Sequence, residues 1–197
     1  MNLKFSCLKS LTESSPNAKV YVLVNKMDKL DEEKRNIIFS MKKDKLEAKA
    51  GNFKINFYET SIWEISLYKA FSNILSNIIK NKIDVKKLLE EYYIACDANE
   101  VILFDKSTLI PISDYNNKEI KDEERFEKMC YLMKKFKSNI KKFNELIIKN
   151  KSNTILFDEF IDNAYIMVIS SNKNISLELL RLNLEIIKKK FYDVLNN

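Results

Sequence analysis

The sequence predicts an α/β protein made of two units. In the first unit, two short apolar runs, Lys19 to Val24 (KVYVLV) and Lys54 to Tyr58 (KINFY), alternate with helical patterns. A continuous valine-rich run suits a strand that is buried on both faces of a parallel sheet. In the second unit, short strands follow one another closely between helices, which is typical of an antiparallel sheet. We therefore expect helix–strand–helix–strand–helix over Met1 to Asn81, and an α+β unit after it.

The helices of the first unit are predicted from charged residues near their starts and from proline and glycine near their ends. Pro16 ends a first helix, which we expect over Met1 to Ser15. A second helix is expected from Asp31 to about Ala50, because acidic residues in its first turn are favoured by the helix dipole. Gly51 then suits the position just after its end. The third helix, Ser66 to Asn81, has a strong apolar face.

We place the boundary between the units near Lys82, giving residues 1–82 and 83–197. The second unit is expected to read α-β-β-α-β-β-α, and its last helix begins after Ser176 as the cap. Pro111 in the second strand indicates an edge or a bulge there. Its four strands are expected at Glu100 to Phe104, Thr108 to Ser113, Thr154 to Phe160 and Ala164 to Ser170.

A long helix is expected between the two strand pairs, from Lys121 to Lys149. Its apolar positions alternate in steps of three and four residues, which predicts a face packed on the sheet of the same unit. Part of this face is also a candidate dimer seam. The positions are Phe126, Met129, Met133, Phe136, Ile140, Phe143 and Ile147.

Three amino-acid counts exclude much chemistry. The chain has no histidine, so histidine triads and histidine-bound zinc are excluded. It has one glycine, Gly51, so neither GxxxxGK[ST] nor GxGxxG occurs in these 197 residues. The three cysteines, Cys7, Cys96 and Cys130, are widely spaced, and we interpret them as buried thiols in a reducing compartment.

The net charge of +6 comes from lysines that are used throughout the chain, which indicates a coding bias rather than a binding patch. We therefore expect no nucleic-acid partner. A basic nucleic-acid adaptor is a weaker alternative, whose affinity would fall steeply with salt. Without an apolar run of 18 residues or a secretory leader, the sequence predicts a cytoplasmic protein.

One tetrapeptide carries recognisable chemistry. Asn25-Lys26-Met27-Asp28 fits the NKxD pattern that reads guanine, and it lies where a buried strand ends and a helix follows. The Asp28 carboxylate can accept both N1–H and N2–H of guanine, which adenine cannot match. Asn25 can bond the opposite edge of the base, and the Lys26 stem can lie flat against the ring.

A second loop lies at the end of the next strand, at Glu59-Thr60-Ser61-Ile62. In GTPases a short serine-containing loop there offers backbone N–H groups to guanine O6. The predicted guanine-binding residues are therefore Asn25, Lys26, Asp28, Ser61 and Ile62. Trp63 follows directly; it could report on or gate the base, but we expect it to be packed.

These segments resemble Rag GTPases of the RagA/RagB type. The resemblance is carried by PNAKVYVLVNKMD, RNIIF and TSIWEISLYKAFSNI, and it continues through DANEVILFDKSTLIPISDY and RFEKMCYLMKKFKSNIKK. Trp63, Tyr68 and Lys69 favour RagA/RagB over RagC/RagD. Asn25 stands where many Rag proteins carry histidine, but asparagine is the commoner residue in other GTPases.

The resemblance implies the C-terminal half of a Ras-like P-loop G domain, followed by a roadblock/longin-like dimerisation domain. It implies GTP or GDP as ligand, with Mg²⁺ in the intact protein. It also implies a RagC/RagD-like partner subunit, paired through residues 83–197, and a Ragulator-like scaffold. The pair would be recruited through that scaffold to the lysosomal or vacuolar membrane, and would signal amino-acid sufficiency to the TOR kinase complex.

The sequence departs from Rag proteins in having no P-loop, switch regions or DxxG strand. Either it starts at an internal methionine, or the chain lacks the phosphate half. Since affinity depends largely on Mg²⁺ and the phosphate cradle, we expect no GTP hydrolysis by this chain alone, and we assign no catalytic or metal-binding residue. The alternative function is a non-catalytic scaffold that dimerises and binds no nucleotide.

Overall fold

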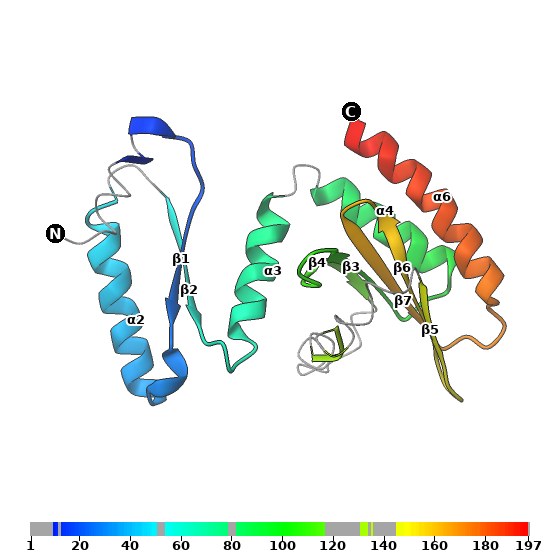
Figure 1. The fold of residues 1–197 in the computed structure, drawn as a ribbon, viewed down its shortest axis with the longest axis horizontal. Helices are drawn as coiled ribbons and strands as arrows, with labels where there is room; N and C mark the ends of the chain where they lie inside the picture. The colour runs from blue at the N-terminus through cyan, green and yellow to red at the C-terminus, as the bar shows by residue number, and fades with distance from the viewer. Residues whose placement is uncertain are drawn as a thin grey trace. The chain divides into compact units, whose positions relative to one another are not determined.

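The computed structural model describes residues 10–11, 13–50, 54–78, 82–116, 131–133, 135 and 145–196 (Figure 1). The chain divides into two compact units, Met1–Ile74 and Leu75–Asn197. This division falls within α3 (Ser66–Ile78), upstream of the Lys82 boundary, which stays a prediction. Each unit is described by itself below.

The first unit is built on two parallel strands, β1 (Val20–Asn25) and β2 (Ile55–Thr60). Val20 pairs with Ile55 and Asn25 pairs with Thr60, so the strands begin and end together. Parallel strands need a long crossover, and here it contains the helix α2 (Glu32–Glu47). Asp31 caps α2 by accepting a 3.0 Å hydrogen bond from the Lys34 N–H. The predicted strands and the parallel sheet are confirmed.

The helix α2 lies beside this strand pair (Figure 1), and a small apolar cluster holds the two together. Its buried members are Ala50 and Ile55, and Val20, Val22, Leu46 and Phe57 pack against them. The apolar side chains at the carboxyl ends of the strands are also covered, since Val24 and Met27 are buried. The loops that follow the strands therefore begin from anchored positions.

The second unit contains a five-stranded antiparallel sheet with the order β4-β3-β7-β6-β5. The strands are β3 (Glu100–Asp105), β4 (Pro111–Asn116), β5 (Glu145–Lys149), β6 (Thr154–Ile161) and β7 (Ala164–Ser170). Two helices, α4 (Lys82–Ala95) and α6 (Leu177–Asn196), cover one face of the sheet (Figure 1). The Ser176 hydroxyl oxygen accepts from the Leu179 N–H at 3.2 Å, which confirms the predicted cap.

The main core lies between these helices and the sheet. Tyr92 of α4 is fully buried, and its hydroxyl donates a 3.1 Å hydrogen bond to the Leu180 carbonyl of α6. Burial raises the pKa of the Cys96 thiol to about 11, so this thiol is protonated at neutral pH. The prediction of a buried thiol is thus confirmed for Cys96, whereas Cys7 and Cys130 lie outside the described residues.

The predicted helix from Lys121 to Lys149 is wrong at its C-terminal end. Glu145–Lys149 is strand β5, and Ile147, expected on the helical face, pairs with Leu156 of β6. The Glu145 carboxylate also accepts two 2.7 Å hydrogen bonds from the Arg181 guanidinium of α6. The segment has three consecutive apolar residues, and so short an apolar run fits a strand and a helix equally well. The pairing with β6 decides between them.

Pro111 lies at the start of β4, which is an outer strand of the described sheet. The β3–β4 register shifts between Leu103 and Phe104, and Phe104 pairs with Pro111. Proline cannot donate to a ladder, so an outer strand beside an irregularity accommodates it. The prediction of an edge or a bulge is confirmed.

Other predictions fall on segments that the structure does not describe. They concern most of the first helix (Met1 to Ser15), Gly51, and residues 121–130, 134 and 136–144 of the predicted long helix. Within that long helix, Met133 is described and is buried. Among the described residues, no helix has the length and apolar content that are needed to cross a membrane.

The core of the second unit gives a direct stability test. Leu184 of α6 lies in the core and is 1% exposed, whereas Leu182 of the same helix is 60% exposed. We expect Leu184→Ala to lower the free energy of unfolding by about 2–5 kcal/mol, because it leaves a cavity. Leu182→Ala, the matched control, should change it by less than about 1 kcal/mol. Urea unfolding followed by circular dichroism measures both, and equal losses would contradict the packing described here.

Candidate functional site

The predicted site residues lie in two loops at the same edge of the first unit. The first loop follows β1 and the second follows β2, and the parallel register places Asn25 beside Thr60. The Asn25 Oδ1 atom accepts a 2.5 Å hydrogen bond from the Thr60 hydroxyl, whose side chain is fully buried. The structure therefore brings the starting points of both loops together.

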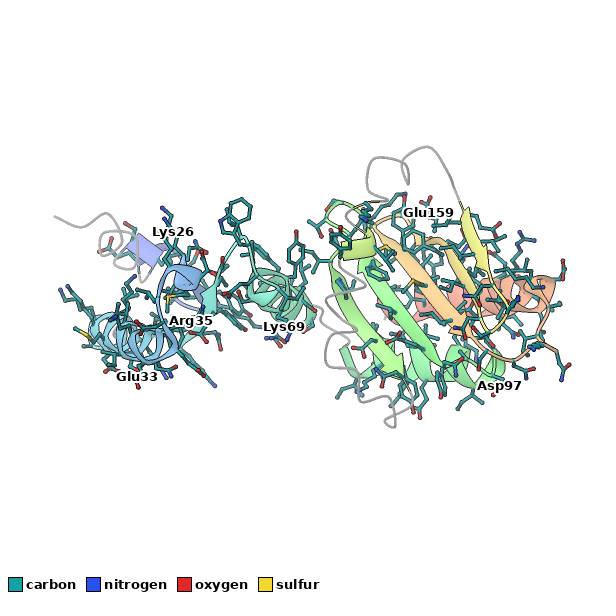
Figure 2. All side chains as sticks on the ribbon, turned by 90° about the horizontal axis from the view of Figure 1, so that it is seen from below. Lys26, Glu33, Arg35, Lys69, Asp97 and Glu159 are labelled. Carbon is teal, nitrogen blue, oxygen red and sulfur yellow. The ribbon has the colours of Figure 1, made fainter. Side chains whose placement is uncertain are left out.

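The first loop exposes its polar side chains around a buried anchor. Met27 is 2% exposed and begins a short 3-10 turn, Met27–Lys29. Lys26, just before it, has a left-handed backbone with φ 67°, while Asp28 is partly exposed. Lys26 is labelled in Figure 2. The buried Met27 side chain anchors the turn, and the Lys26 and Asp28 side chains on either side of it are exposed and partly exposed, where a ligand can contact them.

The second loop is shaped by hydrogen bonds of Ser61, which is fully buried. The Ser61 N–H donates to the Ser66 hydroxyl at 3.0 Å, and the Ser61 hydroxyl oxygen accepts from the Trp63 N–H at 3.1 Å. Within the described chain, the Ile62 N–H between them forms no hydrogen bond. The Ser61 N–H is thus engaged inside the loop, and the Ile62 N–H is the donor that remains for a ligand.

The expectation that Trp63 is packed is wrong. Its side chain is 82% exposed, and that of Ile62 is 66% exposed. The loop anchors itself by burying Ser61 instead, so the two apolar side chains after it face outward. Trp63 is the only tryptophan of the chain, which makes its fluorescence a reporter for this loop.

Arg35 of α2 contacts both loops, and the sequence interpretation did not single it out. Its Nε donates to the Met27 carbonyl at 3.1 Å, and its Nη2 donates to Glu64 Oε1 at 3.0 Å. Arg35 is labelled in Figure 2. The second Glu64 oxygen accepts from the Ser66 hydroxyl at 3.4 Å. A lone arginine on a polar helix gives no sequence signal, because its partners are remote along the chain.

The chemistry of this arrangement suits a flat, polar ring. A carboxylate at Asp28 can accept from two neighbouring N–H groups, and the Ile62 N–H can donate to a carbonyl oxygen. Guanine has both features, whereas adenine lacks the pair of donors. Among the described residues, no group of three or more acidic or cysteine side chains is placed to hold a metal ion.

The sequence over residues 2–133 matches the family model described as the Gtr1/RagA G protein conserved region. Two parallel strands with an NKxD loop at their carboxyl ends are typical of guanine-nucleotide-binding proteins. The chain belongs to the Gtr1/RagA family of G proteins, which confirms the family that its motifs predicted.

Curated relatives match along almost the whole chain. Ras-related GTP-binding protein B of Rattus norvegicus is 33% identical over 190 residues, covering 94% of this chain and 51% of the relative. Ras-related GTP-binding protein A of Dictyostelium discoideum is 33% identical, covering 98% and 65%. GTP-binding protein GTR1 of Saccharomyces cerevisiae is 32% identical, covering 93% and 65%. The chain thus spans half to two-thirds of these relatives.

Solved structures resemble this chain over part of its length. MglB of Myxococcus xanthus covers 60% of this chain and 92% of its own, with a TM-score of 0.48 at 14% identity. A Roadblock/LC7 domain from Streptomyces avermitilis covers 57% and 98%, with a TM-score of 0.44 at 11% identity. Both likenesses are partial, with TM-scores below 0.5.

The left-handed backbone of Lys26 predicts how glycine substitutions in this loop change stability. A non-glycine residue at φ 67° costs about 1–2 kcal/mol, so Lys26→Gly relieves strain while it loosens the unfolded chain. We expect its free energy of unfolding to stay within about 1 kcal/mol of the parent. Lys29→Gly, in the same turn, should lose about 1 kcal/mol. Urea unfolding compares the two, and a larger loss for Lys26→Gly would contradict this account.

Proposed function

We propose that the chain is part of a Rag-type guanine-nucleotide-binding regulator, and that its first unit reads the guanine base. The observation that carries the proposal is the placement of an NKxD loop beside a serine-containing loop at one sheet edge. Membership of the Gtr1/RagA family supports it. The names of the relatives, which describe GTP-binding proteins, agree with this assignment.

In the proposed complex, each site residue has one task. Asp28 accepts from guanine N1–H and N2–H, and the Ile62 N–H donates to O6. The Lys26 stem covers one face of the ring. Asn25 holds the two loops together through Thr60, as its 2.5 Å hydrogen bond already does. Ser61 fixes the loop that presents Ile62.

The phosphates and Mg²⁺ would have to be held by other residues. No GxxxxGK[ST] segment occurs in the 197 residues, and the residues that the structure describes contain no cluster of metal ligands. Since the phosphate cradle and Mg²⁺ supply much of the affinity, the chain by itself should bind nucleotide weakly. We do not propose GTP hydrolysis by these residues alone.

Substitution of Asp28 tests base reading. In Asp28→Asn the side-chain amide can donate to a carbonyl at position 2 of the ring, which xanthine has and guanine lacks. We expect the variant to lose mant-GDP binding at least tenfold and to gain mant-XDP binding, equivalent to about 1.4 kcal/mol or more. Energy transfer from Trp63 to the mant group measures both titrations.

Asp44→Asn, on the opposite end of α2, is the control and should leave both titrations unchanged. If the parent chain shows no saturable mant-GDP binding, base reading by this chain fails. The scaffold alternative, in which the second unit assembles without nucleotide, would then be the better account.

We also propose that the chain assembles with a RagC/RagD-like subunit through its second, roadblock-like unit. GTP-binding protein GTR2 of Saccharomyces cerevisiae is 28% identical over 108 residues, which supports a family with two related subunit types. The outer faces of α4 and α6 also expose large apolar side chains, as protein-binding surfaces do. They are Ile83, Ile94, Leu179, Leu182 and Ile186.

The wider role proposed is that of a signalling subunit. The pair would dock on a Ragulator-like scaffold at the lysosomal or vacuolar membrane and report amino-acid sufficiency to the TOR kinase complex. This part follows from the family resemblance. Contact with the membrane would come through the scaffold only.

Sedimentation velocity tests the assembly. We expect the chain, mixed with a GTR2-type subunit, to sediment as a one-to-one complex. Leu184→Ala should weaken the complex only to the extent that it unfolds the second unit. A chain that stays monomeric in the mixture would contradict the partner proposal and leave base reading untouched.

A further inference from the structure

A chain of polar contacts joins the two loops of the site through α2. We propose that Arg35 is a positioning residue that sets the separation of the two loops, and with it the orientation of the backbone N–H groups at Ser61 and Ile62. The inference rests on the proposed function for its purpose, but its geometry can be tested without a ligand.

The first step is the shape of the guanidinium. Arg35 donates from two different nitrogens, Nε to the Met27 carbonyl at 3.1 Å and Nη2 to Glu64 Oε1 at 3.0 Å. Because the guanidinium is planar and rigid, its two donors keep a fixed spacing. The backbone of the first loop and the carboxylate of the second are therefore held at a set distance from each other.

The second step carries this constraint to the backbone of the second loop. Glu64 accepts from the Ser66 hydroxyl at 3.4 Å, and the same Ser66 oxygen accepts from the Ser61 N–H at 3.0 Å. The network therefore runs from the Met27 carbonyl to the Ser61 N–H. The residue after Ser61 carries the donor proposed for the base carbonyl.

The third step is the setting of the ion pair. The Arg35 and Glu64 side chains are 27% and 35% exposed, so they are partly shielded from water. The neighbouring pair, Lys34 and Asp31, is 67% and 56% exposed and lies within one helix turn. An exposed pair of that kind contributes little, whereas hydrogen bonds to charged groups in a shielded network contribute more. This contrast supplies a matched control.

The Asn25–Thr60 hydrogen bond does not duplicate this role. It joins the last residues of the two strands, where the ladder already fixes their spacing. Arg35 instead contacts the loops beyond the strands, where no ladder continues. In enzymes, a displacement of about 1 Å at a positioning group can cost about a hundredfold in rate, so a contact that fixes the separation of the two loops serves a precise site.

Amide hydrogen exchange of the 197-residue chain, resolved by NMR, tests the coupling directly. Arg35→Gln should speed exchange of the Ser61 and Trp63 amides about tenfold, since the charged hydrogen bonds that order this loop are lost. Arg35→Lys keeps the charge but loses the planar group with two donor nitrogens at a fixed spacing, so it should retain only part of the protection. Lys34→Gln should change nothing in this loop.

The location of the effect separates positioning from plain destabilisation. The amides of β1 that donate to β2 are protected in the parent chain and should keep their protection in Arg35→Gln. If exchange rises equally at these amides and at Ser61, the first unit has unfolded as a whole and the positioning role is overturned. Unchanged exchange at Ser61 overturns it as well.

A double-substitution cycle identifies the partner. If Glu64 transmits the constraint, Glu64→Gln combined with Arg35→Gln should speed Ser61 exchange no further than Arg35→Gln alone. If the two substitutions instead multiply each other's effects on Ser61 exchange, the Arg35–Glu64–Ser66 route is overturned.

Mant-GDP titration of the single variants tests the consequence for binding. It should show about tenfold weaker binding for Arg35→Gln and none of this loss for Lys34→Gln. Absence of mant-GDP binding to the parent chain would refute the proposed function, while the exchange data would still decide the coupling.

Discussion

The parallel pairing of β1 with β2 is the constraint from which the candidate site follows. Two parallel strands cannot be joined by a tight turn, so the chain must return to the starting edge before the second strand begins. The helix α2 makes this return. As a result, the loop after Asn25 and the loop after Thr60 emerge side by side, although 35 positions separate these residues in the sequence.

The same crossover explains why a residue of α2 can contact both loops. A helix that starts just after the first loop has its N-terminal turn beside that loop, and Arg35 lies in this turn. Its side chain can therefore contact the Met27 carbonyl behind it and Glu64 in the second loop. The strand pairing, the crossover and the polar network are thus consequences of one topology.

Much of the fold could be predicted from the sequence because its signals are local. A valine-rich run, an acidic first turn and a serine cap each act within a few residues, and the structure confirms β1, α2 and the cap of α6. The NKxD pattern is equally local, and the structure places its residues at the expected strand end. Their role in binding remains a prediction.

The predictions that failed did so for a different physical reason, because tertiary contacts between distant segments decided the outcome. Glu145–Lys149 is a strand because β6 offers it a hydrogen-bonding partner, and nothing within the segment itself rules out a helix. Trp63 is exposed because Ser61 takes the buried position of its loop. Arg35 was missed because both its partners come from other elements. In each case the deciding contact is with another segment of the chain.

The two units also differ in what determines their local geometry. The second unit has an extended apolar core between its sheet and two helices, so packing fixes the positions of its elements. The described part of the first unit has a small apolar cluster, in which Ala50 and Ile55 are the buried members. Packing alone therefore constrains its loops less. Hydrogen bonds donated by Arg35 and Thr60, and the one that the Ser66 hydroxyl oxygen accepts from the Ser61 N–H, supply the missing restraint. A site held this way depends on single polar side chains, which is why a change at Arg35 should alter the loops while the strands beneath them stay intact.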